Sequence, residues 1–250
     1  MDAARTALLV TALADRLRGL GCVAVGATSP LPATATLLAR ARAEAAGGRL
    51  QAIILGSLRH NPFTDGGREL FDCAAQGRID AFFLSGGQID GGGNVNLVGT
   101  GGYPAIAHRF PGSFGSAYLA YLVPHVILYR EEHSRRTLVP RVDFVSAPGT
   151  SADGTYRPGG PTALVTGRCV FAFDRDRGRF TLESLHPGET VAGIEEHTGF
   201  DFDVPPAGRA RDRLPRTPPP SADDVHLLRG RVAEELAETY PRFAAVIASL

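Results

Sequence analysis

The stretch Gly77–Asn96, GRIDAFFLSGGQIDGGGNVN, decides the fold of this chain. Its apolar run Ile79–Leu84 predicts a buried strand, and a glycine-rich turn follows at once. Four polar side chains are spaced through that turn: Gln88, Asp90, Asn94 and Asn96. Glycine lets a backbone approach a ligand closely, and short amide and carboxylate side chains either hold such a turn together or bind substrate. Because a second glycine turn, Arg109–Ser116, follows further along the chain, we expect a site built at the ends of sheet strands.

Apolar segments of helix and strand length alternate through the first 130 residues. Helices are expected over 3–18, 30–46 and 67–76, and strands over 22–25, 51–55, 79–84 and 126–129. This alternation predicts an α/β fold with an open, mostly parallel sheet and flanking helices. His125, at the head of the last of these strands, is expected to be a core histidine.

The pattern changes after Asp143. Three short strands over 163–165, 169–173 and 180–185 predict an antiparallel portion or a sheet edge. Six prolines within residues 201–220 predict an extended arm, and Ser221 is expected to cap a final helix with a break at Pro241. We therefore predict an α/β domain over residues 1–200. Residues 201–250 would form an arm and a C-terminal helix that pack on this domain or on a partner.

The composition excludes several classes of function. With 44% hydrophobic and 21% charged residues, the 250-residue chain is typical of a globular protein with a buried core. Its formal net charge is zero, so no global positive field attracts nucleic acid or an anionic membrane. All 26 basic residues are arginine, which leaves no lysine for a Schiff base. The sequence shows neither an apolar run of membrane-spanning length nor a signal-peptide pattern, and we predict a cytoplasmic protein.

The cysteines and histidines form no metal-binding pattern. Cys22, Cys73 and Cys169 are far apart and odd in number, which fits reduced thiols. The seven histidines include no HxxxH or HxH spacing. We therefore expect no metal site and no bound cofactor.

Five segments, in the same order, resemble the β subunit of class I CoA-transferases of the glutaconate and 3-oxoacid type. They are Gly77–Asn96, Arg109–Ser116 (RFPGSFGS), His133–Gly149 (HSRRTLVPRVDFVSAPG), His186–Pro205 (HPGETVAGIEEHTGFDFDVP) and Pro218–Arg229 (PPPSADDVHLLR). The chain looks still more similar to the related β subunit of the acyl-CoA hydrolase that opens the last ring in steroid degradation. The resemblance implies a CoA-transferase-like fold, an acyl-CoA thioester as substrate, and an α-type partner subunit in an α2β2 assembly.

The same resemblance implies a change in the chemistry. Transferases of this family carry a glutamate in a Glu-x-Gly motif at a strand end, where it attacks the thioester to form a glutamyl-CoA intermediate. The matching triplet here is Ile54-Leu55-Gly56, and isoleucine offers no nucleophile. The ring-opening hydrolases also lack this glutamate, and their catalytic glutamate resembles one in the α subunit. The resemblance therefore favours hydrolytic C–C cleavage with the catalytic carboxylate on a partner.

Substrate or CoA contacts are predicted for the two glycine turns. Backbone N–H groups at Gly86-Gly87 and at Gly112-Ser113 are candidates to stabilise negative charge on the thioester. Gln88 and Asn94 are candidates to orient substrate, whereas Asp90 and Asn96 are interpreted as structural loop residues.

Two other groups of side chains have two readings each. Arg59 and His60 directly follow the strand of Ile54 and form either a solvated loop or replacement residues in the site. A basic cluster in the arm is either solvated or faces an acidic partner surface. That cluster comprises Arg209, Arg211, Arg213 and Arg216.

Two alternative functions stay open. The chain could be a CoA-transferase subunit that moves CoA between carboxylic acids with a displaced nucleophile. The nearest carboxylates, Asp65 and Glu69, are expected to start the next helix instead. The second alternative is a non-catalytic scaffold subunit that completes the pocket of a catalytic partner.

Overall fold

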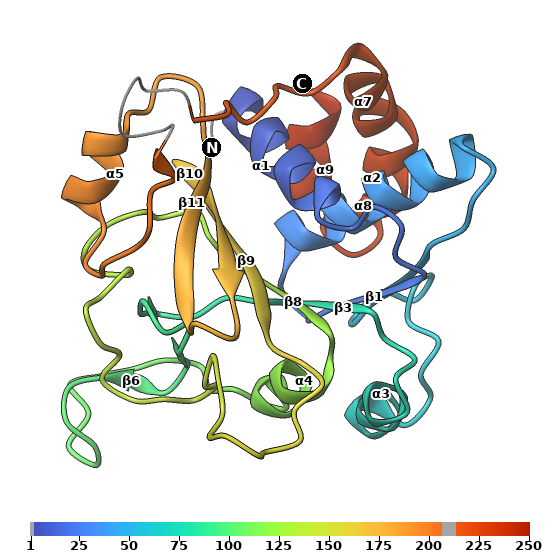
Figure 1. Cartoon of the computed structure of the whole chain (residues 1–250). Coiled ribbons are helices and arrows are strands. Elements are labelled where there is room, and N and C mark those ends of the chain that lie inside the picture. The colour runs from blue at the N-terminus through green and yellow to red at the C-terminus, as the bar shows by residue number, and fades with distance from the viewer. Residues whose placement is uncertain (1–2, 207–213) are drawn as a thin grey trace. The chain divides into compact units, whose positions relative to one another are not determined.

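The computed structural model describes residues 3–206 and 214–250 (Figure 1). The chain divides into two compact units. Unit 1 contains the chain up to Phe83 together with Pro218–Leu250, and unit 2 contains Leu84–Thr217. This division follows the packing of the chain, and the predicted domain over residues 1–200 stays a prediction.

Unit 1 is built on a parallel sheet. The central strand β1 (Cys22–Val25) pairs with β2 (Gln51–Ile54) on one side and with β3 (Ala81–Leu84) on the other, both in parallel. The strands are short apolar runs that are buried along most of their length, as is expected where helices cover both faces of a sheet. The α/β fold with a parallel sheet is thus confirmed for this unit.

Helices flank the strands of unit 1. They are α1 (Ala3–Asp15), α2 (Pro30–Ala45), α3 (Gly66–Ala75), α7 (Ala222–Leu227), α8 (Ala233–Ala237) and α9 (Pro241–Ala248), with one π-helical segment, η1 (Leu228–Val232). Figure 1 shows α1, α2 and the C-terminal helices on one side of β1 and β3, and α3 on the other side. Alanine and threonine dominate α2, so this helix can pack closely against α1, β1 and β2.

The C-terminal helices start and stop as their sequence predicts. The Ser221 side chain accepts a hydrogen bond from the Asp224 N–H, and the Asp224 carboxylate accepts one from the Ser221 N–H, which forms a capping box. The predicted break is confirmed because α9 begins at Pro241, which lacks the N–H that a continuous helix needs.

Unit 2 contains a mixed sheet in the order β8-β9-β10-β11. Its strands are β8 (His125–Arg130), β9 (Pro161–Thr166), β10 (Cys169–Asp174) and β11 (Arg179–Leu185). The first pair is parallel and the other two pairs are antiparallel, which confirms the predicted antiparallel portion. The prediction of a core histidine was wrong, because His125 is exposed at the start of β8 and burial begins at Val126.

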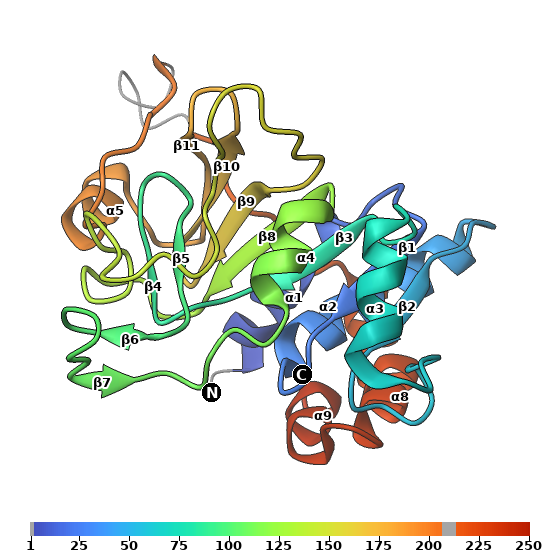
Figure 2. The ribbon, with the colours of Figure 1, turned by 90° about the horizontal axis from the view of Figure 1, so that it is seen from below.

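Aromatic packing and short elements complete unit 2. The ring centroids of Phe173 and Phe180 are 4.8 Å apart, and those of Phe180 and Phe200 are 5.5 Å apart. Two short antiparallel ladders follow the start of the unit (Figure 2). They join β4 (Gln88–Ile89) with β5 (Val95–Asn96), and β6 (Gly99–Thr100) with β7 (His108–Arg109). The unit also contains the short helices α4 (Ser116–Leu122) and α5 (Val191–His197).

The arm follows the last strand of unit 2 where it is described. Asp203 and Arg216 form isolated parallel bridges with Thr181 and Leu185 of β11. The Arg216 side chain donates a hydrogen bond to the Glu189 carbonyl. The other members of the predicted basic cluster, Arg209, Arg211 and Arg213, lie outside the described residues. Among the helices that the structure describes, none is long and apolar enough to cross a membrane.

Candidate functional site

The end of strand β2 carries the residue that the resemblance places at the nucleophile position. Ile54 is only 2% exposed, and its N–H donates to the His60 carbonyl at 3.0 Å. The chain then turns at Gly56, whose φ of +87° favours glycine. An aliphatic side chain packed in the core offers no group that could attack a thioester.

A carboxylate from the distant C-terminal segment holds this turn. Glu238 accepts hydrogen bonds from the Ser57 hydroxyl and from the Leu58 N–H, each at 2.7 Å. These contacts, led by the Leu58 N–H, hold the pKa of Glu238 below its usual range. The Ser57 oxygen also accepts the His60 N–H at 3.0 Å, so the hydroxyl both donates and accepts a hydrogen bond. A carboxylate stabilised in this way is a weak base and a weak nucleophile.

His60 lies in a buried polar network. Its Nδ1 faces an Arg40 N–H at 3.3 Å, and its Nε2 lies 3.2 Å from Glu235. The Glu235 carboxylate also forms ion pairs with Arg40 and, at 2.9 Å, with Arg231. Burial lowers the pKa of His60, and the positive charge of Arg40 lowers it further, so the imidazole is neutral at pH 7. Burial alone would raise the pKa of Glu235, but the two arginines hold it below its usual range.

Arg59 and His60, which follow strand β2, therefore lie in different environments. His60 is buried in unit 1, whereas Arg59 is exposed and forms no side-chain ion pair with the residues that the structure describes. Glu69 is engaged as well: it accepts the backbone N–H groups of Thr64 and Asp65 just before α3. A catalytic role for Arg59 or His60 stays a prediction.

The segment Gly86–Asn96 of unit 2, called the glycine loop below, is held by its own polar side chains. Asp90 is buried, and its Oδ1 accepts the Gly92 N–H at 3.0 Å and the Asn94 N–H at 3.2 Å. The Asn94 side-chain amide also donates to both carboxylate oxygens of Asp90. Its own oxygen accepts the Gly149 N–H at 3.0 Å. Asn94 thus has structural partners on both ends of its amide.

Gln88 and Asn96 form a second pair in the same loop. The Asn96 amide donates to Gln88 Oε1 and to the Gly99 carbonyl, each at 2.7 Å. Gln88 Oε1 also accepts the Asp143 N–H at 3.0 Å. Within the described part of the chain, the Gln88 Nε2 group donates no hydrogen bond. This amide nitrogen is therefore one polar group of the loop without an acceptor among the residues described, and Gln88 itself is buried.

The backbone donors of the glycine turns are partly engaged. The Gly87 N–H donates to the Asn96 carbonyl at 3.0 Å, and the Gly112 N–H donates to the Leu97 carbonyl at 3.1 Å. The Gly86 and Ser113 N–H groups form no hydrogen bond with the residues described. A Cβ at position 87 would lie 2.1 Å from the Phe110 ring, so packing alone already requires glycine there.

A cavity of about 510 Å³ opens against the glycine loop. Its wall includes Asp90, Gly92 and Asn94 on one side and Phe200 and Arg141 on another. Sequence reasoning missed Arg141, because nothing in the spacing of residues ties it to the loop. In residues 3–206 and 214–250, no group of three or more His, Cys, Asp or Glu side chains could hold a metal ion.

Comparison with known proteins identifies the class to which this α/β chain belongs. Residues 46–197 match the family model described as coenzyme A transferase, and the chain belongs to this family. It is 31% identical over 167 residues to the B subunit of 3-oxoadipate CoA-transferase from Pseudomonas knackmussii. It is 33% identical over 129 residues to the B subunit of glutaconate CoA-transferase from Acidaminococcus fermentans. The predicted resemblance to β-type subunits is thereby confirmed.

These curated relatives are matched over part of their length. The two alignments cover 64% and 49% of this chain, and they span 62% and 48% of the relatives, which is less than two thirds of either. The activity, substrates and partners of those relatives therefore bear on this chain as proposals.

Solved structures extend the likeness to nearly the whole fold. The decarboxylase AibA/AibB is 26% identical with a TM-score of 0.74, over 98% of this chain and 99% of that chain. IpdAB of Rhodococcus jostii RHA1 has a TM-score of 0.76 at 24% identity, over 90% of this chain and 93% of that chain. Glutaconate coenzyme A-transferase of Acidaminococcus fermentans has a TM-score of 0.74 at 22% identity, with the same coverage. The last two show the fold alone, and the predicted CoA-transferase-like fold is confirmed.

Proposed function

We propose that this chain is the β-type subunit of an enzyme that cleaves a carbon–carbon bond in an acyl-CoA thioester by hydrolytic ring opening. Its partner would be an α-type subunit that supplies the catalytic carboxylate. The observation that carries the proposal is the buried Ile54 at the end of β2. A chain without a carboxylate there lacks the group that transfers CoA through a glutamyl thioester.

The other carboxylates of unit 1 near Ile54 are poorly suited to act as a general base, which supports a base on the partner subunit. Glu235 is held by Arg40 and Arg231, and Glu238 by the Ser57 hydroxyl and the Leu58 N–H. Hydrogen bonds to the charged form lower the pKa of a carboxylate and make it a weak base. A general base works best with a pKa near the working pH, which neither group has.

The glycine turns of unit 2 offer hydrogen-bond donors that could stabilise the negative charge on the thioester during ring opening. In ring opening, activated water adds to a ketone of the substrate, the adjacent C–C bond breaks, and its electron pair moves onto the thioester as an enolate. The ketone carbon becomes a carboxylic acid, and the enolate then takes up a proton. The Gly86 and Ser113 N–H groups and the Gln88 Nε2 group are the proposed donors to this charge. Loss of one such donor typically costs about 3 kcal/mol of transition-state stabilisation.

Decarboxylation is the second candidate, and one observation favours it. The decarboxylase AibA/AibB is similar over 98% of this chain at 26% identity. Loss of CO2 also breaks a C–C bond and leaves negative charge that a thioester can accept, so the same donors would serve. Neither reaction requires a nucleophile in place of Ile54.

Co-expression with an α-type CoA-transferase subunit, followed by a screen of acyl-CoA esters, tests the proposal. Loss of substrate with CoA retained on the product supports ring opening, and CO2 release supports decarboxylation. Transfer of CoA to an acceptor acid, or a hydroxylamine-sensitive thioester on a carboxylate of this chain, would contradict both and support a transferase with a displaced nucleophile. Unchanged turnover in the complex after Gln88→Ala would instead support a scaffold subunit.

A further inference from the structure

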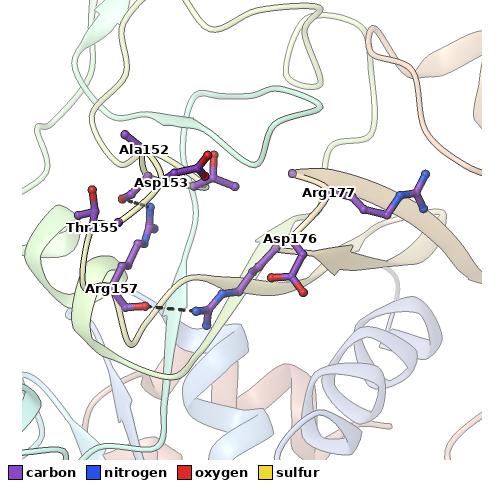
Figure 3. A pocket seen from close by; sticks show the side chains of 12 residues that line it. Ala152, Asp153, Thr155, Arg157, Asp176 and Arg177 are labelled. Atoms are coloured by element: carbon purple, nitrogen blue, oxygen red, sulfur yellow. Dashed lines mark hydrogen bonds between the residues drawn. The ribbon is translucent and has the colours of Figure 1, made fainter.

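A second cavity in unit 2, of about 480 Å³, is lined by other residues than the cavity beside the glycine loop. One wall is the segment Gly149–Arg157, which is rich in glycine and hydroxyl side chains, and the other is the turn Arg175–Gly178 between β10 and β11. Figure 3 shows Asp153, Thr155 and Arg157 of the first wall and Asp176 and Arg177 of the second. Arg175, in the same turn as Asp176, donates a hydrogen bond to the main-chain carbonyl of Arg157 at 3.3 Å.

Two arginines of this cavity are held by neutral partners. Arg157 donates to the carbonyls of Gly159 at 3.0 Å and Pro148 at 2.7 Å, to the Ala120 carbonyl at 3.4 Å and to the Ser151 hydroxyl at 3.3 Å. Arg175 donates to the Pro158 carbonyl at 3.2 Å and to the Arg157 carbonyl at 3.3 Å. Among the residues described, no carboxylate lies within 4.0 Å of either guanidinium group.

Two like charges are thus fixed next to each other without a counter-ion. The pKa of Arg157 is lowered by burial and, next, by the charge of Arg175. The other charged groups in the wall do not relieve this repulsion. Arg177 is paired with Asp203 at 2.7 Å, while Asp153 and Asp176 form no ion pair with the two arginines. An anion bound between the guanidinium groups would relieve it.

The geometry of the donors favours a phosphate group over a single-atom anion. A guanidinium group presents N–H donors in a planar fork that matches two oxygens of a phosphate. Arg175 uses two of its nitrogens on carbonyls and keeps its Nε–H and one N–H on each terminal nitrogen for a ligand. The hydroxyl groups of Ser151 and Thr155 in the same wall can donate to further oxygens.

The neighbours of the cavity indicate what carries the phosphate. Tyr156 does not itself line the cavity, but it stands in the chain between Thr155 and Arg157, which do, and it is 83% exposed. An exposed aromatic ring is a surface on which a base can stack. The wall is also joined to the proposed substrate loop, because the Gly149 N–H donates to Asn94 Oδ1 at 3.0 Å. A Cβ at position 149 would lie 2.0 Å from the Gly92 carbonyl oxygen, which shows how closely the two segments pack.

We propose that Arg157 and Arg175 bind the 3′-phosphate of the adenosine end of CoA, with Tyr156 beside the adenine. The ligand identity rests on the proposed function, whereas the anion site rests on the two arginines. An extended thioester would then be held at its nucleotide end by this cavity and at its acyl end by the glycine loop.

Calorimetric titration of the full chain with adenosine 3′,5′-bisphosphate, with inorganic phosphate and with adenosine tests this assignment. Arg175→Gln is the informative variant, because Arg175 is exposed and its loss leaves no buried charge unpaired. Arg135→Gln is the matched control: Arg135 is also exposed and also donates to carbonyls, those of Glu195 and Glu196, outside the cavity.

We expect Arg175→Gln to weaken the binding of the bisphosphate by about tenfold or more, which is the usual effect of losing a charge-assisted pair. Arg135→Gln should leave its affinity unchanged. Tyr156→Ala should weaken the bisphosphate but not inorganic phosphate. Equal effects of the two arginine variants, or binding of adenosine as tight as that of the bisphosphate, would overturn the site. Binding of inorganic phosphate as tight as that of the bisphosphate would overturn the assignment to the nucleotide.

A second measurement separates this inference from the proposed function. In the complex with the α-type subunit, CoA should bind at least about tenfold more tightly than dephospho-CoA, and Arg175→Gln should abolish that ratio. A ratio near one in the wild-type complex would overturn the inference while acyl-CoA turnover continued. Arginine-dependent binding of the bisphosphate without any turnover of acyl-CoA esters would support the site and contradict the proposed reaction.

Discussion

The turn after β2 and the glycine loop after β3 are both strand-end turns, but they are held in different ways. The turn after β2 depends on Glu238, which is 181 residues from Ser57 and 180 from Leu58. The glycine loop is held chiefly from within: Asp90 bonds to Asn94 four residues away, and Gln88 to Asn96 eight residues away. The turn after β2 is thus held by a carboxylate distant in the sequence. The glycine loop is held by contacts among its own side chains, to which the N–H groups of Asp143 and Gly149 add hydrogen bonds.

This difference bears on the prediction that Ile54 stands at the family's nucleophile position. At the end of β2 the isoleucine joins the core, and the polar groups around it serve the C-terminal helices instead of a substrate. The glycine loop is held by Asp90, Asn94 and Asn96, and the Gln88 amide nitrogen donates no hydrogen bond to the residues described. The loop is therefore the region of this chain where ligand contacts are expected, and the turn after β2 is expected to matter mainly for stability.

The largest effect is expected for Glu235→Gln, in the network fixed by tertiary packing. Glu235 is 5% exposed and receives Arg40 and Arg231. Without that charge, the remaining carboxylate near Arg40 among the residues described is Glu44 at 3.5 Å, so a largely buried guanidinium loses its main ion-pair partner. We expect a loss of about 3 kcal/mol in the free energy of unfolding, measured by urea denaturation. The exposed neighbour Glu234→Gln is the control, and equal stabilities of the two variants would contradict the network.

A somewhat smaller effect is expected for Asp90→Asn in the glycine loop. The carboxylate accepts three backbone N–H groups, those of Gly92, Asn94 and Val142, and the Asn94 amide. An asparagine would turn an NH2 group toward one set of these donors. We expect a loss of about 2 kcal/mol, because buried donors are left unpaired. Asp201→Asn, on the wall of the same cavity, is the control. An unchanged stability would show that the loop does not depend on its own side chains.

The sequence predicted the locally determined features well. The alternation of apolar runs placed the strands β1, β2, β3 and β8, and the Ser221 cap and the Pro241 break were found from local chemistry alone. Asp90 and Asn96 were interpreted as loop residues because short polar side chains beside glycine bond to their own backbone. Each of these features depends on residues that are close together in the chain.

Features that depend on tertiary contacts could not be predicted in this way. His60 was predicted either in a solvated loop or among the residues of the site. The solvated loop was wrong, because His60 lies in a buried network with Glu235, 175 positions away by residue number, whereas a role in the site stays a prediction. The exposure of His125 was missed because a strand pattern does not say which end is covered. The Asn94 amide was predicted to orient substrate, and its bonds to Asp90 and Gly149 became visible only in the fold.

A pH dependence is expected from His60. Its folded pKa lies below the ordinary 6.5, so the stability that the neutral ring contributes is complete above pH 6.5 and is lost as the pH falls below it. We expect the free energy of unfolding to fall between pH 6.5 and 4.5, before Glu235 and Glu238 titrate, and to fall less in His60→Gln. His133, whose pKa burial lowers to about 3, titrates equally in both proteins and cancels in the difference. Parallel pH profiles would show that His60 does not stay neutral in the folded state.

The smallest effect is expected for Glu238→Gln. Glu238 lies on an exposed position, and its contacts are hydrogen bonds to Ser57 and Leu58 without a buried ion pair. A glutamine keeps one oxygen for the Leu58 N–H and loses the charge, so we expect a loss of about 1 kcal/mol. A double-mutant cycle with Ser57→Ala measures the coupling directly, since both side chains meet in one bond. A loss as large as that of Asp90→Asn would break the comparison, because the turn after β2 would then depend on one exposed carboxylate as strongly as the glycine loop depends on its buried one.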